Sequence, residues 1–243
     1  MKYLRLFETD EDYEDYINNP TALPNVSRVN QSEQKQKYNF LFKDPEVRRI
    51  LSSKISNGGK PLTLDRIRQI TSIGTWFYPN SKIKNFDEFE YFTGVTSLSQ
   101  HAFRGCGNLV SIKLPKTLTS MAGYAFYSCE KLQSIVIPNG ITVLGEYLFR
   151  FCYYMNKLVL PSTITNIYNY AFNYLGNKLT NGCNITIFTI NPPICQDNVW
   201  GFSKINKIYV PSDSVDLYKA AQYWSSYASK IQAIPNDFVS PYE

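Results

Sequence analysis

The sequence predicts a solenoid of stacked, β-rich coils with helical caps at both ends. Its first indication is a 23-residue period, which is kept by four phenylalanines, three cysteines and three prolines. They are Phe103, Phe126, Phe149 and Phe172; Cys106, Cys129 and Cys152; and Pro115, Pro138 and Pro161. Its second indication is that a unit of this length cannot bury its own apolar face, so that successive units must stack on one another.

One unit predicts two short strands and a turn. In residues 134–138, alternation places Ile135 and Ile137 inward and Val136, like its later equivalent Val159, outward. The proline at the end of the segment terminates the strand. A second short strand follows, as over residues 117–121. The turn that carries Phe126 comes next, and we expect the phenylalanine rings to fill the core between coils and the cysteines to be small buried fillers.

The unit resembles a known family. The pattern Ala-Phe-x-x-Cys-x-x-Leu-x-x-Ile-x-Leu-Pro over residues 102–115, repeated from 125 and 148, is similar to the BspA-like leucine-rich repeats of gut Bacteroidetes. The resemblance covers residues 92–175 and departs from the pattern at Leu148, Met155 and Leu175. It implies a leucine-rich-repeat solenoid.

The chain divides into four predicted parts: a small α+β attachment module (1–43), a helical N-cap with an irregular first coil (44–91), the repeats (92–183), and final strands with a helical C-cap (184–243). Asp44-Pro45 predicts a helix start, with helices over 47–55 and 63–70. The loop between them lacks the carboxylates of a calcium site. At the other end we expect a strand over 185–193, an edge strand over 208–211 and a helix over 215–221 that Ser212 and Ser214 can cap. Trp224, Tyr227 and Ile231 would seal the open end.

The first 43 residues hold a run of acids, Glu8 to Asp15, which fits the positive end of a helix capped by Thr9. Residues 3–9 and 23–27 resemble N-terminal segments of structural proteins of Bacteroides-infecting tailed phages. No signal peptide is evident in this chain. The resemblance implies attachment to other virion proteins through residues 1–43.

Composition argues against most catalytic chemistries. His101 is the one histidine in 243 residues, and no CxxC, P-loop, GxSxG or dinucleotide motif occurs. We therefore expect no enzyme activity, no cofactor and no metal. The longest apolar runs are too short to span a membrane. No basic run predicts nucleic-acid binding, and whether Cys183 and Cys195 pair is left open.

Aromatic residues form a candidate binding surface on the repeats. His101, Tyr124, Tyr147 and Tyr170 keep the 23-residue step, and Arg104 and Arg150 each stand three positions beyond one of them. The predicted surface consists of His101, Arg104, Tyr124, Tyr127, Tyr147, Arg150 and Tyr170. Tyrosine offers a large, rigid contact area for partners. The alternative is that these rings simply pack between coils.

The predicted function is non-catalytic recognition or structure. The first hypothesis is a phage virion component, such as a fibre, a tail protein or a capsid decoration. The alternative is a bacterial cell-surface or secreted adhesin that binds host protein or glycan. Homo-oligomers are common among virion proteins, but no heptad stretch predicts a coiled coil here, and the oligomeric state is left open.

Overall fold

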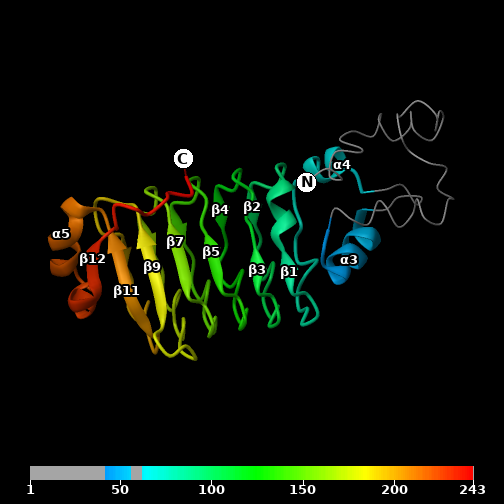
Figure 1. The fold of residues 1–243 in the computed structure, drawn as a ribbon. Coiled ribbons are helices and arrows are strands. Elements are labelled where there is room, and N and C mark those ends of the chain that lie inside the picture. Colours follow the sequence, from blue (N-terminus) through cyan, green and yellow to red (C-terminus); the bar gives the residue numbers. More distant parts are fainter. Residues whose placement is uncertain (1–41, 56–61, 243) are drawn as a thin grey trace, which may run out of the picture.

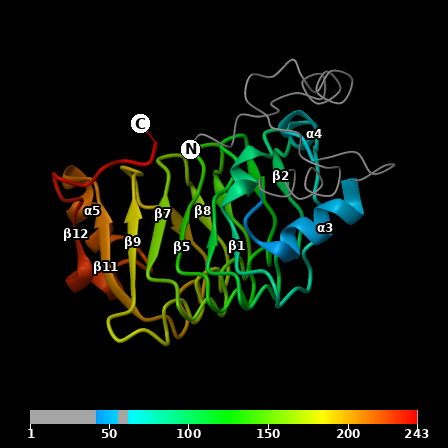
Figure 2. The same ribbon diagram turned by 45° about the vertical axis from the view of Figure 1, so that its right-hand side comes forward.

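The structure is a computed structural model that describes residues 42–55 and 62–242. It is an elongated stack of coils, with helices α3 and α4 at one end and α5 with β12 at the other (Figure 1). Turning the molecule shows the strands of successive coils lying side by side along the whole stack (Figure 2). The predicted solenoid is therefore confirmed.

Within the described residues, one parallel sheet of seven strands forms the main face of the solenoid, which we call the main sheet. Its strands, in spatial order, are β1 (Asn85–Phe86), β3 (Ser111–Ile112), β5 (Ser134–Val136), β7 (Lys157–Leu160), β9 (Cys183–Ile187), β11 (Ile205–Val210) and β12 (Ile231–Ala233). Ser134 pairs with Lys157, its equivalent in the next repeat, so these coils add strands in register. The register shifts once, between Ile205 and Lys207 of β11.

A second set of short strands lies on another face. These are β2 (Ser97–Leu98), β4 (Ser120–Met121), β6 (Val143–Leu144), β8 (Asn166–Ile167) and β10 (Ile194–Cys195). They pair in parallel as β2 with β4 and as β6, β8 and β10. The predicted second strand of each unit is confirmed, although it is only two residues long. The rest of each coil is a series of turns, which we call the turn face.

Phenylalanine rings fill the core between coils. Phe103, Phe126, Phe149 and Phe172 are all buried. The Phe126 ring lies 5.2 Å from that of Phe103 and 5.6 Å from that of Phe149, nearly parallel to both. Trp200 continues the row, since its ring lies 5.2 Å from that of Phe172. The core thus contains stacked aromatic rings along the solenoid axis, among the buried aliphatic side chains of the same coils.

The N-terminal end is closed by α3 (Pro45–Ile55) and α4 (Leu64–Arg68), followed by the 3-10 helix η2 (Asp87–Tyr91). Asp44 begins α3 as predicted, because its Oδ1 accepts from the backbone N–H of Glu46 at 2.8 Å. Its Oδ2 accepts from the N–H of Lys84 at 2.7 Å, which ties the helix to the start of β1. Thr63 caps α4, at the predicted start of the second helix.

The C-terminal cap differs from the prediction in two respects. The edge strand was expected over 208–211, but β12 pairs with β11, so the edge of the main sheet is Ile231–Ala233. A serine cap was expected for α5 (Val215–Ala220), but no side chain caps it, because Ser212–Ser214 form the 3-10 helix η3. Another 3-10 helix, η4 (Ser225–Lys230), leads into β12. Trp224 and Ile231 are buried and Tyr227 is half-buried, which confirms the predicted seal.

The last residues run back along the stack, past the C-terminal ends of β11, β9 and β7 (Figure 1). The Tyr242 hydroxyl donates to the carbonyl of Ile137 at 2.7 Å, and its ring lies 5.4 Å from that of Phe188. Val159 was expected to point outward, yet it is buried, and it lies outside the hydrophobic core cluster. The C-terminal segment therefore covers part of the outer face.

Some predictions fall on residues that the structure does not describe. They are the attachment module, apart from Phe42 and Lys43, and the loop 56–60 between the first two helices. None of the helices in the described ranges is long and apolar enough to cross a bilayer.

Candidate functional site

The turn face repeats one unusual backbone conformation in four successive coils. His101, Tyr124, Tyr147 and Tyr170 have φ angles of 66°, 61°, 56° and 59°. This left-handed region is unfavourable for residues with a Cβ, by about 1–2 kcal/mol each. The N–H of Tyr124 donates to the carbonyl of Glu146 at 2.9 Å, and that of Tyr147 to Asn169 at 3.0 Å, so the coils hold one another's turns in place.

The side chains at these positions form a row of rings. The centroids of His101 and Tyr124 lie 5.3 Å apart, those of Tyr124 and Tyr147 4.7 Å, and those of Tyr147 and Tyr170 5.1 Å. All four residues are half-buried, so each keeps part of its surface in solvent. The predicted ladder is therefore present as a physical unit.

Both predicted arginines lie over these rings. The Arg104 guanidinium carbon is 4.9 Å from the ring centroid of Tyr127 and 5.9 Å from that of Tyr124. The Arg150 guanidinium carbon is 5.2 Å from the Tyr147 centroid and 5.5 Å from that of Tyr170. Such cation–π contacts hold a guanidinium in place while its N–H groups stay available.

The arginines lack acidic partners in the described part of the chain. Among residues 42–55 and 62–242, neither Arg104 nor Arg150 forms an ion pair or a side-chain hydrogen bond, and the Arg150 Nε is buried with no acceptor. The rings shield one side of each guanidinium and leave its other donors for water or a ligand. The seven predicted residues thus form one surface, which we call the aromatic–arginine strip.

Further residues that the predicted surface does not include lie beside it. Tyr78 stands one 23-residue step before His101, its ring lies 5.7 Å from that of His101, and it is 41% exposed. A second row runs beside the first, with Phe151 5.3 Å from Tyr127 and 5.1 Å from Tyr174. Phe151 and Tyr174 keep the same 23-residue step, so the signal was present in the sequence.

Burial shifts the pKa values of two residues of the strip, His101 and Tyr124. The pKa of His101 is lowered, first by burial and then by the charge of Arg104. Burial also raises the pKa of the Tyr124 hydroxyl. Both effects favour the uncharged side chain at neutral pH, so the arginines carry the charge of the strip.

The cysteine column belongs to the core. Cys106, Cys129 and Cys152 are buried, and each thiol donates to a phenylalanine carbonyl of the preceding coil, at 3.2, 3.1 and 3.4 Å. Cys183 and Cys195 are also buried and free, so they do not pair. These five thiols are structural fillers, as expected for the column.

The described ranges contain no group of three or more histidine, cysteine, aspartate or glutamate side chains placed to hold a metal ion. His101 contacts the rings of Tyr78 and Tyr124, and its buried Nδ1 has no hydrogen-bond partner among the residues that the structure describes. This arrangement lacks the hydrogen-bonded base and orienting carboxylate of a nucleophilic site.

Comparison with known proteins identifies the repeat. The sequence model of the BspA type leucine rich repeat region matches residues 71–190 as six copies. No curated protein matches the chain. Among solved structures, a leucine rich cell surface protein from Faecalibacterium prausnitzii A2-165 is 25% identical, with a TM-score of 0.46. The match covers 60% of this chain and 37% of that protein. Over residues 71–190 this chain is therefore similar to the BspA type leucine rich repeat region.

Proposed function

We propose that the protein is a non-catalytic recognition protein that acts at a cell surface or outside the cell and binds an acidic segment of a protein partner on the aromatic–arginine strip. One observation carries this proposal. Aromatic side chains occupy a strained left-handed backbone position in four successive coils, and two guanidiniums without an ionic partner among the described residues are held over them. Strained, repeated positions of this kind are typical of binding sites.

The spacing of the arginines suggests the form of the ligand. Arg104 and Arg150 occupy equivalent positions two coils apart, because two 23-residue steps separate them. Neighbouring coils lie about 4.8 Å apart, which places the two positions about 10 Å apart. A peptide in the polyproline II conformation advances about 3.1 Å per residue and completes one turn every three residues, so carboxylates three residues apart lie on one side of it and would reach both guanidiniums.

Support for a non-catalytic role comes from the same strip. Besides its tyrosines and arginines, the one titratable side chain of the strip is His101, whose pKa is lowered by burial and whose ring is held between aromatic neighbours. Large aromatic and arginine side chains are the residues enriched where binding energy concentrates in protein interfaces.

The place of action is proposed from the type of repeat, which resembles the BspA-like class. The virion hypothesis rests on residues 3–9 and 23–27, which lie outside the described ranges, and the comparisons reported above give it no support. Attachment through residues 1–43 and the division into four parts stay predictions. The cell-surface alternative is the one that we carry forward.

Fractionation of the native source tests the location. Cell-envelope, cytosolic, culture-supernatant and virion fractions are analysed by mass spectrometry for peptides of this chain. Enrichment in the envelope or the supernatant is expected. Co-sedimentation with purified virions would overturn the surface assignment and restore the first hypothesis.

A set of extended peptides tests the strip. Each carries two glutamates separated by one to five positions in a Gly/Ser background, and fluorescence anisotropy measures binding to the full chain. We expect the tightest binding at a spacing of about three, the repeat of a polyproline II peptide, and its loss in the Arg104→Gln/Arg150→Gln variant. Lys116→Gln/Lys131→Gln is the matched control, because it removes the same charge from two exposed lysines. Equal binding at every spacing, or equal weakening by both variants, would show that the peptides bind only by non-specific charge attraction and would overturn the proposal.

A further inference from the structure

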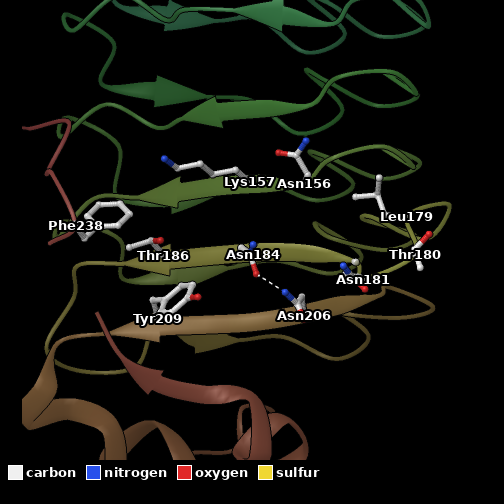
Figure 3. A pocket seen from close by; sticks show the side chains of 11 residues that line it. Asn156, Lys157, Leu179, Thr180, Asn181, Asn184, Thr186, Asn206, Tyr209 and Phe238 are labelled. Atoms are coloured by element: carbon white, nitrogen blue, oxygen red, sulfur yellow. Dashed lines mark hydrogen bonds between the residues drawn. The ribbon is translucent and has the colours of Figure 1, made fainter. Parts of the chain in front are cut away.

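A hollow lies over the outer side of the main sheet, on a different face from the aromatic–arginine strip. It has a volume of about 520 Å³ and spans the outer side of β7, β9 and β11. Figure 3 shows Phe238 of the C-terminal segment at one end and the loop with Leu179 and Thr180 at the other. Its volume lies in the range of pockets for small organic ligands. The strip takes no part in it.

Asparagine side chains dominate the polar lining. They are Asn156, Asn181, Asn184 and Asn206. The Asn206 Nδ2 donates to the Asn184 Oδ1 at 2.9 Å, as the dashed line in Figure 3 marks. This bond leaves the Oδ1 of Asn206 and the Nδ2 of Asn184 for a ligand. Because an amide both donates and accepts, paired amides suit a ligand rich in hydroxyl groups, which do the same.

Two aromatic rings complete the lining. Tyr209 stands on β11 near Thr186, and Phe238 of the C-terminal segment lies at the same end of the hollow, away from Asn206 (Figure 3). Phe238 is held by the Phe188 ring at 6.0 Å and by the Lys157 ammonium at 5.3 Å. Sugars present a flat C–H face that packs on aromatic rings while their hydroxyls bond at the ring edge. Aromatic rings at one end of the hollow and paired amides toward the other are the combination that such a ligand needs.

The charge of the lining narrows the ligand further. No carboxylate lines the hollow in the described part of the chain, and Lys157 is the one charged side chain among these lining residues. Divalent cations need oxygen ligands with negative charge, so they do not fit. The hollow also lies on the face of the sheet and not at its open edge, so a peptide could not add to it as a strand.

We propose that this hollow binds a short oligosaccharide, with its hydroxyls on Asn184 and Asn206 and a sugar ring packed on Tyr209. The C-terminal segment forms one wall through Phe238, so the site depends on the chain folding back over its own sheet. Lys157 is placed to favour a saccharide that carries a carboxylate or sulfate. This site shares no residue with the aromatic–arginine strip, so the two proposals can be tested separately.

A printed array of neutral and acidic oligosaccharides, probed with the full chain, provides the first test. The best binder is then titrated by calorimetry against Tyr209→Ala, which is expected to weaken binding by about tenfold. The matched control is Tyr154→Ala, at an exposed tyrosine that does not line the hollow. Tyr209→Phe keeps the ring and should retain binding, which guards against a folding defect in the alanine variant.

Three outcomes decide the proposal. Loss of binding in Tyr209→Ala and in Asn184→Ala, with Tyr154→Ala and the arginine variant of the strip unaffected, supports it. A preference for acidic sugars that Lys157→Gln removes supports the role of the lysine. No saccharide binding on the array, or binding lost only when the strip is altered, overturns it.

Discussion

The rings of Tyr124 and Tyr147 lie 4.7 Å apart, and both residues have a positive φ, 61° and 56°. The row follows from the 23-residue repeat, which puts the same position of successive coils side by side, and at this position the backbone is left-handed. A glycine would adopt this backbone freely but would remove the ring. The chain instead places an aromatic side chain at this position in coil after coil.

The backbone part of this arrangement can be measured at Tyr147. We expect Tyr147→Gly to be more stable than Tyr147→Ala by about 0.5–1 kcal/mol, because both lose the ring but only glycine relieves the left-handed backbone. Urea unfolding of the two variants gives the difference. Thr142 supplies the control, since it is exposed and has no positive φ, and there alanine should be the more stable. Equal or reversed stabilities at position 147 would show that the turn is not strained.

The inner aromatic stack supplies a larger share of stability. Phe126 is fully buried between Phe103 and Phe149. We expect Phe126→Ala to lower the free energy of unfolding by about 3–5 kcal/mol, through lost burial and the cavity left behind. Phe202→Ala is the comparison, because that ring is 69% exposed, and it should cost about 0.5 kcal/mol. A similar loss for both would mean that the stack is not the core of the fold.

The sequence predicted the repeat well because repetition reports packing directly. A residue type that returns at every 23-residue step occupies the same place in every coil, so burial of the phenylalanine and cysteine columns followed from spacing alone. The strip followed in the same way. The row of Phe151 and Tyr174 carried the same signal at the same spacing. Tyr78 did not, because Phe77 stacks on Phe103 from 26 residues before it, so the 23-residue step does not place Tyr78 in the row of His101.

Features without a period could not be predicted. Tyr242 bonds to the carbonyl of Ile137, far back in the chain, and β12 pairs with β11 through a cap that occurs once. The hollow over the main sheet is lined by the 179–182 loop and by Phe238 of the C-terminal segment, and neither belongs to the 23-residue repeat. The left-handed backbone of the tyrosines could not be predicted either, since tyrosine has no preference for that conformation.

The thiols provide a test of packing in the repeat region. All five cysteines of the chain are buried and free. Burial raises the pKa of Cys106 and of Cys195 to about 12, and it raises the pKa of the other three as well. Because the thiolate is the reactive form, we expect no thiol of the native protein to react with an aromatic disulfide reagent at pH 8 within minutes.

Two controls complete the thiol experiment. All five thiols should react once the chain is unfolded in guanidinium chloride. Ser162→Cys adds a thiol at an exposed position on the turn after β7, and it should be modified at once in the native state. Rapid labelling of Cys106 or Cys152 in the unaltered protein would show that the coils open, contrary to a closed core.

The N-terminal cap should weaken in acid. The pKa of Glu46 is lowered from 4.5 to about 2, first by its hydrogen bond from Arg49 and then by that from Asn80, at 2.7 Å. A lowered pKa in the folded state means that the carboxylate stabilises the fold above about pH 4.5 and loses this contribution as the pH falls toward 2. The bond to Asn80 joins α3 to the first coil, so the loss should loosen the cap.

The comparison that isolates this effect is Glu46→Gln, followed by thermal unfolding between pH 2 and pH 7. The wild-type protein should melt higher than the variant at neutral pH, and the two curves should converge as the pH falls, because glutamine mimics the protonated carboxyl. Glu130→Gln, at an exposed carboxylate that forms no ion pair in the described ranges, should shift the melting temperature equally little at every pH. A constant gap between wild type and Glu46→Gln across the whole range would show that the charge on Glu46 does not hold the cap.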